Sequence, residues 1–232
     1  MTESRSQPTT ELRLGPLRLK GASALIAMVL LVAWIVWAIV RARPWEHPSP
    51  LWISGLLWVT YQIYWGAAAA KAAPSASAES AKSRALHTNL LTVGLLLLFV
   101  PVPGLRGRWL PVARRVAPVG LAVQALSLAL MIWARRHLGR YWSGEISKKV
   151  GHELVRSGPY RWVRHPIYTG MLGMYLGTAI VAARFHALLG FVIAVFAYAR
   201  KIPMEEKNLG ELFGAQYDDY RKHSWALVPL VF

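Results

Sequence analysis

The composition of the chain indicates a membrane as its surroundings. Of its 232 residues, 55% are hydrophobic and only 16% are charged. Soluble domains carry about 25% charged residues, so the composition excludes an ordinary soluble domain of this size. The chain has no cysteine, which excludes disulfides, thiolate metal sites and a cysteine nucleophile.

The charge is strongly positive, with 27 Lys and Arg against 11 Asp and Glu and a formal net charge of +16. These cations stand in short segments between apolar runs, for example at Arg135 and Arg136. Such cations anchor helix ends and contact anionic lipid headgroups. We therefore expect membrane lipid as a partner, and no nucleic acid.

Six apolar segments approach the roughly 20 residues that a helix needs to cross a bilayer. They are Ala22 to Val40, Leu51 to Ala70, Leu90 to Val102, Val116 to Trp133, Pro166 to Ala182, and His186 to Ala199. The first segment lacks a small-residue cleavage site, so we interpret it as a span and not as a signal peptide. Because only three residues separate the last two segments, they predict a helical hairpin. The predicted fold is all-α and integral to the membrane, with five or six transmembrane helices.

The chain changes character after Pro203, where apolar and aromatic residues recur at helical spacing opposite charged ones. The recurring residues are Leu209, Leu212, Phe213, Tyr217 and Tyr220. This pattern predicts a C-terminal amphipathic helix, starting at Pro203 and lying at the membrane interface.

Lys and Arg distribute unevenly over the two sides of a six-span topology. Counting on alternate sides gives 20 on one side and 7 on the other. The positive-inside rule then directs both termini and residues 138–165 to the cytoplasm. The arginines between Arg106 and Arg115 run against the rule.

The stretch from His152 to Gly170, HELVRSGPYRWVRHPIYTG, leads from a cationic, aromatic loop into an apolar helix. Pro166 suits the first helical turn, so Arg164 and His165 should stand at the helix entrance with free backbone donors nearby. Such an entrance can seat a carboxylate or phosphate. The alternative is ordinary interfacial anchoring by Arg, His and Tyr.

Two further features allow two interpretations each. Glu205 and Glu206 favour the positive end of a helix dipole, but they could also bind a cationic or hydroxyl-bearing ligand opposite the cationic loop. Gly170, Gly173 and Gly177 share one helix face, which indicates close helix packing first and room for a ligand second. The seven histidines are scattered and show no metal-ligand spacing, so we expect no metal.

Five ordered motifs together resemble the signature of the isoprenylcysteine carboxyl methyltransferase family. They are H-x-L-V-x-x-G-P-Y at His152 to Tyr160, R-H-P-x-Y-x-G at Arg164 to Gly170, E-E-x-x-L at Glu205 to Leu209, F-G-x-x-Y-x-x-Y at Phe213 to Tyr220, and Val228 with Pro229. The match covers roughly Leu138 to Phe232. Upstream, the chain is similar to the family only in having hydrophobic helices.

The resemblance implies an S-adenosylmethionine-dependent methyltransferase whose lipophilic acceptor is methylated on a carboxylate. It implies that nine residues line the cofactor pocket: His152, Leu154, Val155, Tyr160, His165, Pro166, Ile167, Tyr168 and Glu205. Arg164 and Glu206 are the candidate catalytic residues. Arg164 and His165 should hold the cofactor's carboxylate, and Glu205 or Glu206 its ammonium or ribose hydroxyls.

The acceptor side departs from the family. Lys201 stands where eukaryotic members have a substrate-binding Arg, with Arg200 beside it, and we expect both to bind the acceptor. Lys cannot grip a carboxylate through two bonds as Arg does. His223, Ser224 and Trp225 replace the usual Arg-Val-Pro. A carboxylate acceptor is already a nucleophile, so no acid/base dyad is expected, only near-attack positioning in a dry site.

The resulting organisation has three parts: a cytoplasmic segment 1–21, four transmembrane helices in 22–137, and a cofactor-binding region 138–232. We expect a bacterial inner-membrane protein whose active site faces the cytoplasm. Three alternatives stay open. They are an NAD(P)H-dependent reductase of the sterol type, which shares a similar R-H-P-x-Y stretch, a phospholipid N-methyltransferase, and a non-catalytic membrane protein.

Overall fold

The structure is a computed structural model, and it describes residues 11–14, 17–20, 49–69, 76–77, 79–110, 113–139, 147–148 and 154–229. Contacts divide the chain into two units, Met1–Ser49 and Pro50–Phe232. In the first unit, β1 (Glu11–Leu14) and β2 (Leu17–Lys20) pair as an antiparallel hairpin, which the sequence did not predict. The expected span from Ala22 to Val40 lies outside the described residues.

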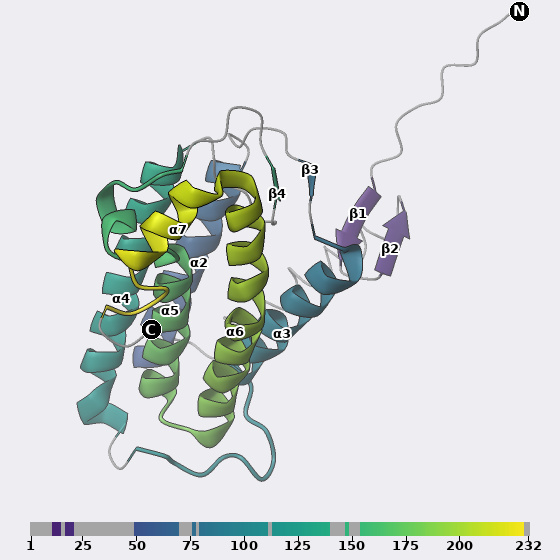
Figure 1. Ribbon diagram of the computed structural model, residues 1–232. Coiled ribbons are helices and arrows are strands. Elements are labelled where there is room, and N and C mark those ends of the chain that lie inside the picture. The colour runs from purple at the N-terminus through teal and green to yellow at the C-terminus, as the bar shows by residue number, and fades with distance from the viewer. Residues whose placement is uncertain are drawn as a thin grey trace, which may run out of the picture. The chain divides into compact units, whose positions relative to one another are not determined.

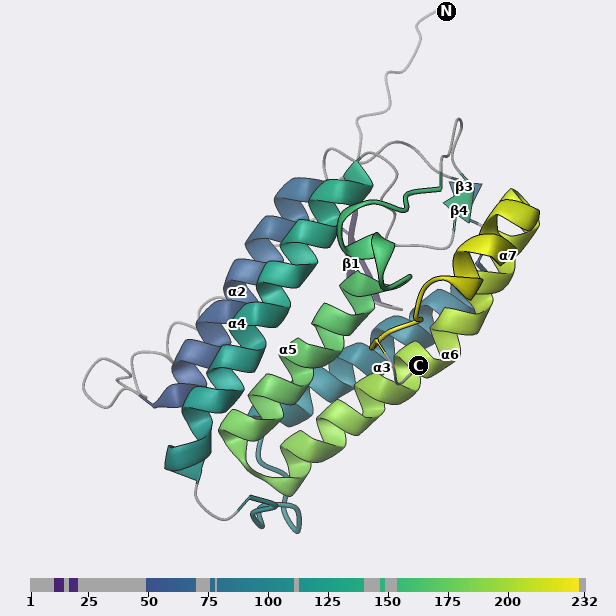
Figure 2. The same ribbon diagram turned by 60° about the vertical axis from the view of Figure 1, so that its left-hand side comes forward.

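The second unit is a helical bundle (Figures 1 and 2). Its described α-helices are α2 (Pro50–Ala69), α3 (Ala81–Phe99), α4 (Ala113–Leu138), α5 (Pro166–Ala182), α6 (Phe185–Phe213) and α7 (Ala215–Lys222). A 3-10 helix, η2 (Gly158–Arg161), precedes α5, and two short strands, β3 (Ala76–Ser77) and β4 (Ser147–Lys148), pair antiparallel. Helix α5 packs against both α4 and α6, while α2 lies beside α4 and α3 beside α6. The all-helical prediction is therefore confirmed for this unit.

The limits of α5 and α2 agree closely with the prediction, whereas α3 begins earlier than predicted. Helix α5 begins and ends where the apolar segment does, and α2 differs from its segment by one residue at each end. Helix α3 instead begins at Ala81, well before the predicted Leu90. Ser80 caps it by accepting a hydrogen bond from the Ser83 amide at 3.3 Å. Hydropathy missed the first turns of α3 because they are polar. Their side chains Ser83 and His87 are nevertheless buried, where they contact polar groups on α6.

The prediction that a separate amphipathic helix starts at Pro203 is wrong. Helix α6 continues through Pro203 as far as Phe213, and α7 follows after Gly214, whose φ is 51°. Pro203 removes only one backbone donor, and its ring is exposed, so α6 runs on past it. The chain breaks instead at Gly214, because glycine adopts positive φ without a steric penalty.

The predicted hairpin between α5 and α6 is confirmed, and its turn is tight. Ala183 takes a left-handed φ of 52°, and Arg184 forms an isolated bridge with Arg108 from the α3–α4 connection. His186 is buried, and its Nδ1 lies 2.7 Å from the carbonyl of Leu97. Three of the cations that we counted on the less basic side, Arg106, Arg108 and Arg184, are thus gathered at one end of the bundle.

Close backbone contact holds α5 against α4, because glycines face each other there. A Cβ added to Gly177 would lie 2.5 Å from the carbonyl oxygen of Gly120, and one added to Gly120 would lie 2.6 Å from that of Gly177. The packing interpretation of this glycine face is therefore supported. A buried polar network adds to it: Ser54 donates to Gln124 Oε1 at 2.7 Å, and the Trp58 indole donates to Thr178 at 2.9 Å.

The outward surface of the bundle is apolar. Large hydrophobic side chains are exposed along four helices, among them Leu56 and Ile63 on α2, Leu96 on α3, Leu126 on α4 and Phe196 on α6. By length and hydropathy, two described helices are able to cross a bilayer, α4 from Arg115 and α6; α5 is apolar but shorter. Helices with apolar outer faces and internally satisfied backbones suit lipid, so we describe the protein as integral to the membrane.

We predict that Gly177→Ala destabilises the bundle, because the new methyl group would collide with a backbone oxygen that cannot rotate away. Overpacking of this kind costs about 1–3 kcal/mol. Thermal unfolding of the purified protein in detergent measures the loss. Gly55→Ala on α2 is the matched control, since a Cβ there meets nothing within 4 Å. Equal melting temperatures for the two variants would contradict the prediction.

Candidate active site

The entrance of α5 is held by the C-terminal segment of the chain. The amide of Arg164 donates to the carbonyl of Trp225 at 2.8 Å, and the amide of His165 donates to that of Ala226 at 3.1 Å. The Trp225 amide in turn donates to the carbonyl of Trp162 at 2.9 Å. The amides of Arg164 and His165 themselves are therefore not free, because the C-terminal segment accepts their hydrogen bonds next to a parallel bridge between Val163 and Trp225.

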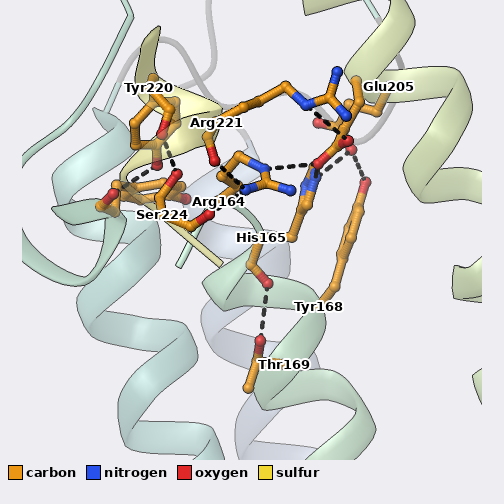
Figure 3. Close-up of polar contacts among 10 residues, drawn as sticks. Arg164, His165, Tyr168, Thr169, Glu205, Tyr220, Arg221 and Ser224 are labelled. Atoms are coloured by element: carbon orange, nitrogen blue, oxygen red, sulfur yellow. Dashed lines mark hydrogen bonds and ion pairs between the residues drawn. The ribbon is translucent and has the colours of Figure 1, made fainter. Parts of the chain in front are cut away.

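Glu206 is the point at which three cationic or ionisable side chains meet. Arg164 Nε donates to Glu206 Oε1 at 2.7 Å, and His165 Nε2 lies 3.3 Å from the same oxygen. Arg221 Nε, from α7, lies 3.7 Å from Oε2. The side chains of Arg164, His165 and Glu206 are only 11%, 4% and 13% exposed. The loop before α5, the polar half of α6 and α7 are thus joined through one carboxylate (Figure 3).

Glu205 makes a separate set of contacts beside Glu206. The Tyr168 hydroxyl donates to Glu205 Oε2 at 2.6 Å, and His165 Nδ1 lies 3.8 Å from the same atom. The rings of His165 and Tyr168 are stacked, with centroids 5.4 Å apart. The Glu205 side chain is 29% exposed, about twice as much as that of Glu206. Glu205 can therefore still accept hydrogen bonds from a ligand.

The C-terminal segment is fixed over this site by side chains as well as by its backbone. Arg164 Nη1 donates to the carbonyl of Ser224, and Thr169 Oγ1 donates to that of Leu227 at 2.6 Å. The Tyr220 hydroxyl donates to the carbonyl of Tyr160 at 2.6 Å, which ties α7 to η2. The segment after α7 is thus part of the site wall (Figure 3).

The tyrosines in this wall are not acids or bases at neutral pH. Burial, with a smaller contribution from the Glu205 carboxylate, raises the pKa of Tyr160 far above its usual value. Burial also raises the pKa of Tyr220 to about 12, against the opposing charges of Arg164 and Arg156. Both hydroxyls therefore stay protonated and able to donate hydrogen bonds, as Tyr220 does to the Tyr160 carbonyl.

A pocket of about 430 Å³ opens against this network. Its lining consists of Arg164 and the consecutive residues 221–226. Ligand pockets generally have volumes of about 300–1,000 Å³, so this one suits a small molecule. Its walls carry the cationic side chains of Arg164, Arg221 and Lys222, which favour an anionic group.

The structure brings together five of the predicted residues: Arg164, His165, Tyr168, Glu205 and Glu206. Pro166 and Tyr160 are buried close by, Ile167, Leu154 and Val155 are half-buried, and His152 lies outside the described residues. Arg200 and Lys201 belong to another cluster, in which Lys201 pairs with Glu79.

Sequence reasoning did not assign Arg221 or the backbone of residues 224–227 to the site. Arg221 directly follows the F-G-x-x-Y-x-x-Y motif, so its place on α7 was a usable signal. The backbone contacts had no such signal, because carbonyl groups do not depend on side-chain identity.

Comparison with known proteins identifies the relatives of the chain. The profile of the Isoprenylcysteine carboxyl methyltransferase (ICMT) family matches residues 119–211. Protein-S-isoprenylcysteine O-methyltransferase A of Arabidopsis thaliana is 30% identical over 153 residues, which cover 65% of this chain and 75% of that protein. The chain belongs to the isoprenylcysteine carboxyl methyltransferase family.

Other relatives agree with this assignment. Protein-S-isoprenylcysteine O-methyltransferase B of Arabidopsis thaliana is 31% identical over 132 residues, covering 56% of this chain and 64% of its own length. The Schizosaccharomyces pombe Protein-S-isoprenylcysteine O-methyltransferase is 36% identical over 81 residues, 34% of each chain. The predicted family is confirmed. The family profile, however, begins inside α4 and ends in α6, earlier at both ends than the predicted match.

A solved structure shares the fold. It is the eukaryotic intramembrane Ras methyltransferase ICMT without a monobody, with a TM-score of 0.51 and 24% identity, covering 63% of this chain and 53% of that one. The similarity supports the observed arrangement of the helices. This chain thus spans about half the length of that structure.

We predict that Arg164→Lys loosens the C-terminal segment. Lysine can still neutralise Glu206, but a single ammonium cannot also reach the Ser224 carbonyl as the guanidinium fork does. Hydrogen exchange of the amides in residues 223–229 should quicken by about tenfold or more, the loss of roughly one charge-assisted hydrogen bond. Arg161→Lys, at an exposed position in η2, is the control. An unchanged exchange rate in Arg164→Lys would show that the guanidinium does not hold the C-terminal segment in place.

Proposed function

We propose that this protein transfers a methyl group from S-adenosylmethionine to a carboxylate on a lipophilic acceptor. The observation that carries the proposal is the meeting of the R-H-P-x-Y segment with the adjacent carboxylates of α6. Arg164 and His165 bind Glu206, and Tyr168 binds Glu205, in a chain of the isoprenylcysteine carboxyl methyltransferase family.

The groups around the pocket fit the cofactor chemically. S-adenosylmethionine, when bound, supplies a methyl group on a sulfonium. Arg164, Arg221 and Lys222 line the pocket and suit the carboxylate of the cofactor, while the partly exposed Glu205, beside Glu206, suits the cofactor's ammonium or ribose hydroxyls. His165 is almost fully buried beneath both carboxylates, so we assign it to positioning them.

The remaining work of the chain is to orient the reactants and exclude water. A carboxylate acceptor is nucleophilic without a base, which agrees with the neutral tyrosines of the site wall. Effective orientation alone can contribute several kcal/mol, up to about 7–11, to lowering a barrier. We propose Arg164 and Glu206 as the residues nearest the reaction, and Arg200 and Lys201 as the residues of the acceptor side.

The membrane setting supports a lipophilic acceptor. Helix α6 carries an exposed apolar face, so an acceptor dissolved in lipid would approach along it, whereas the pocket lies at the polar end of the helix. We propose that this end faces the cytoplasm of a bacterial cell, since the basic segments of the chain favour that side.

Binding of S-adenosylhomocysteine, measured by calorimetry on detergent-purified protein, tests the proposal. We expect saturable binding that weakens by about tenfold or more in Glu205→Gln and His165→Ala, because a hydrogen bond to a charged group contributes about 1.5–3 kcal/mol. Glu211→Gln, at an exposed position on the same helix, should bind as the wild type does.

The same experiment with NADPH separates the alternatives. NADPH binding without S-adenosylhomocysteine binding would overturn the proposal in favour of a reductase, and binding of neither would favour a non-catalytic protein. Methyl transfer to phosphatidylethanolamine in place of a lipophilic acid would overturn the carboxylate acceptor.

A further inference from the structure

A second cluster of charged side chains lies between the start of α3 and the middle of α6. Glu79 Oε2 lies 3.4 Å from Lys201 Nζ, and their side chains are 0% and 5% exposed. Ser83 donates to Glu79 Oε1 at 2.7 Å, and Arg200 Nη2 donates to the Ser83 hydroxyl at 2.7 Å. A continuous chain of contacts therefore runs from Arg200 through Ser83 and Glu79 to Lys201.

The charges that these contacts bring together do not balance. Arg200 and Lys201 are two cations, and Glu79 is the single carboxylate among the residues just named. Arg200 Nη1 is buried and makes no hydrogen bond in the part of the chain that the structure describes. A buried charged group without a full set of partners is costly. The cluster is therefore suited to one further anion at Arg200.

The cluster adjoins the candidate active site. Lys201 and Glu205 are four residues apart on α6, so they are neighbours on one helix face. The Tyr198 ring contacts His87 on one side, with centroids 5.2 Å apart, and Tyr168 on the other, at 4.6 Å. The Tyr168 hydroxyl is the group that donates to Glu205. An anion at Arg200 would thus lie within about two helical turns of the cofactor-side carboxylates.

A row of exposed apolar side chains on α6 ends at Arg200. Exposed apolar side chains precede Arg200 along one face of α6, at Phe185, Leu189, Val192 and Phe196. Their spacing of three or four residues continues to Arg200. An amphiphile with its tail in lipid along this face would present its head group to the guanidinium.

We propose that Glu79 sets the charge specificity of the acceptor site. By pairing with Lys201, it leaves Arg200 to hold the single carboxylate of a lipophilic monoacid, since a guanidinium fork binds one carboxylate through two hydrogen bonds. This inference rests on the proposed function only in naming that ligand as the methyl acceptor.

The preference for one carboxylate over two is tested by comparing the affinities of two amphiphiles with similar tails. These are decanoate, which has one carboxylate, and octylmalonate, which has two. We expect the wild-type protein in lipid nanodiscs to prefer decanoate at neutral pH. Glu79→Gln keeps the shape of the side chain but leaves Lys201 without its carboxylate, so the ratio of the two affinities should shift toward octylmalonate by at least about tenfold. Empty nanodiscs give the background of tail partitioning.

A compensating variant separates charge from structure. Glu79→Gln combined with Lys201→Met removes one charge of each sign, so preference for decanoate should return. An unchanged ratio in Glu79→Gln, or no return in the double variant, would overturn the proposal. If Glu79→Gln does not fold, Lys201→Met tests the proposal by itself. Without the ammonium of Lys201, the negative charge of Glu79 repels an anion at Arg200, so decanoate should bind more weakly. Unchanged decanoate binding would overturn the proposal.

The result is independent of cofactor binding. S-adenosylhomocysteine binding is measured on the same samples, and its absence from the wild type would overturn the proposed function. The shift in charge preference would still support the anion site at Arg200.

Discussion

The polar end of the bundle depends on one constraint: the Glu206 carboxylate is largely removed from water and must find its partners within the protein. Its oxygens can accept several hydrogen bonds, and Arg164, His165 and Arg221 come from separate segments to meet it. Removing one member of such a group leaves the others buried without compensation, which is more costly than the group's net contribution to stability. The network therefore fixes the relative positions of the loop before α5, the end of α6 and α7.

The lipid-embedded half holds α5 by different means. Lipid gives no hydrophobic force between helices, so association depends on close packing and on hydrogen bonds between helices. The facing glycines, Gly120 and Gly177, allow α4 and α5 to touch through their backbones, and Ser54, Gln124 and Thr178 bond across three helices. Because α5 is fixed in this way, Arg164 and His165 at its entrance are held opposite α6.

Hydropathy and motif spacing predicted much of this arrangement. The limits of α5 follow directly from Pro166 and the apolar run, and the charged motifs identified Arg164 and His165, two of the three side chains that meet at Glu206. Periodicity failed at the first turns of α3, because Ser83 and His87 are polar but buried against α6. It failed again at Pro203, where proline was taken to begin a helix although the existing helix continues.

The pairing of Glu79 with Lys201 was beyond the reach of local patterns. Glu79 lies just before α3, in none of the five motifs, and is 122 positions from Lys201 along the chain. Only the packing of α3 against α6 brings them together. Likewise, no sequence pattern indicates that the carbonyls of Ser224, Trp225 and Ala226 accept hydrogen bonds from Arg164 and His165.

The parallel bridge between the C-terminal segment and the entrance of α5 has a consequence for how this family can vary. Trp225 and Ala226 hold Arg164 and His165 through main-chain atoms, which every amino acid shares, and only a proline at Trp225 would remove the donor to Trp162. The Arg-Val-Pro that is usual in the family at residues 223–225 would keep both carbonyls and give up only the amide that donates to Trp162. The length of the connection from α7 is not free, since inserting or deleting one residue would shift every carbonyl out of register.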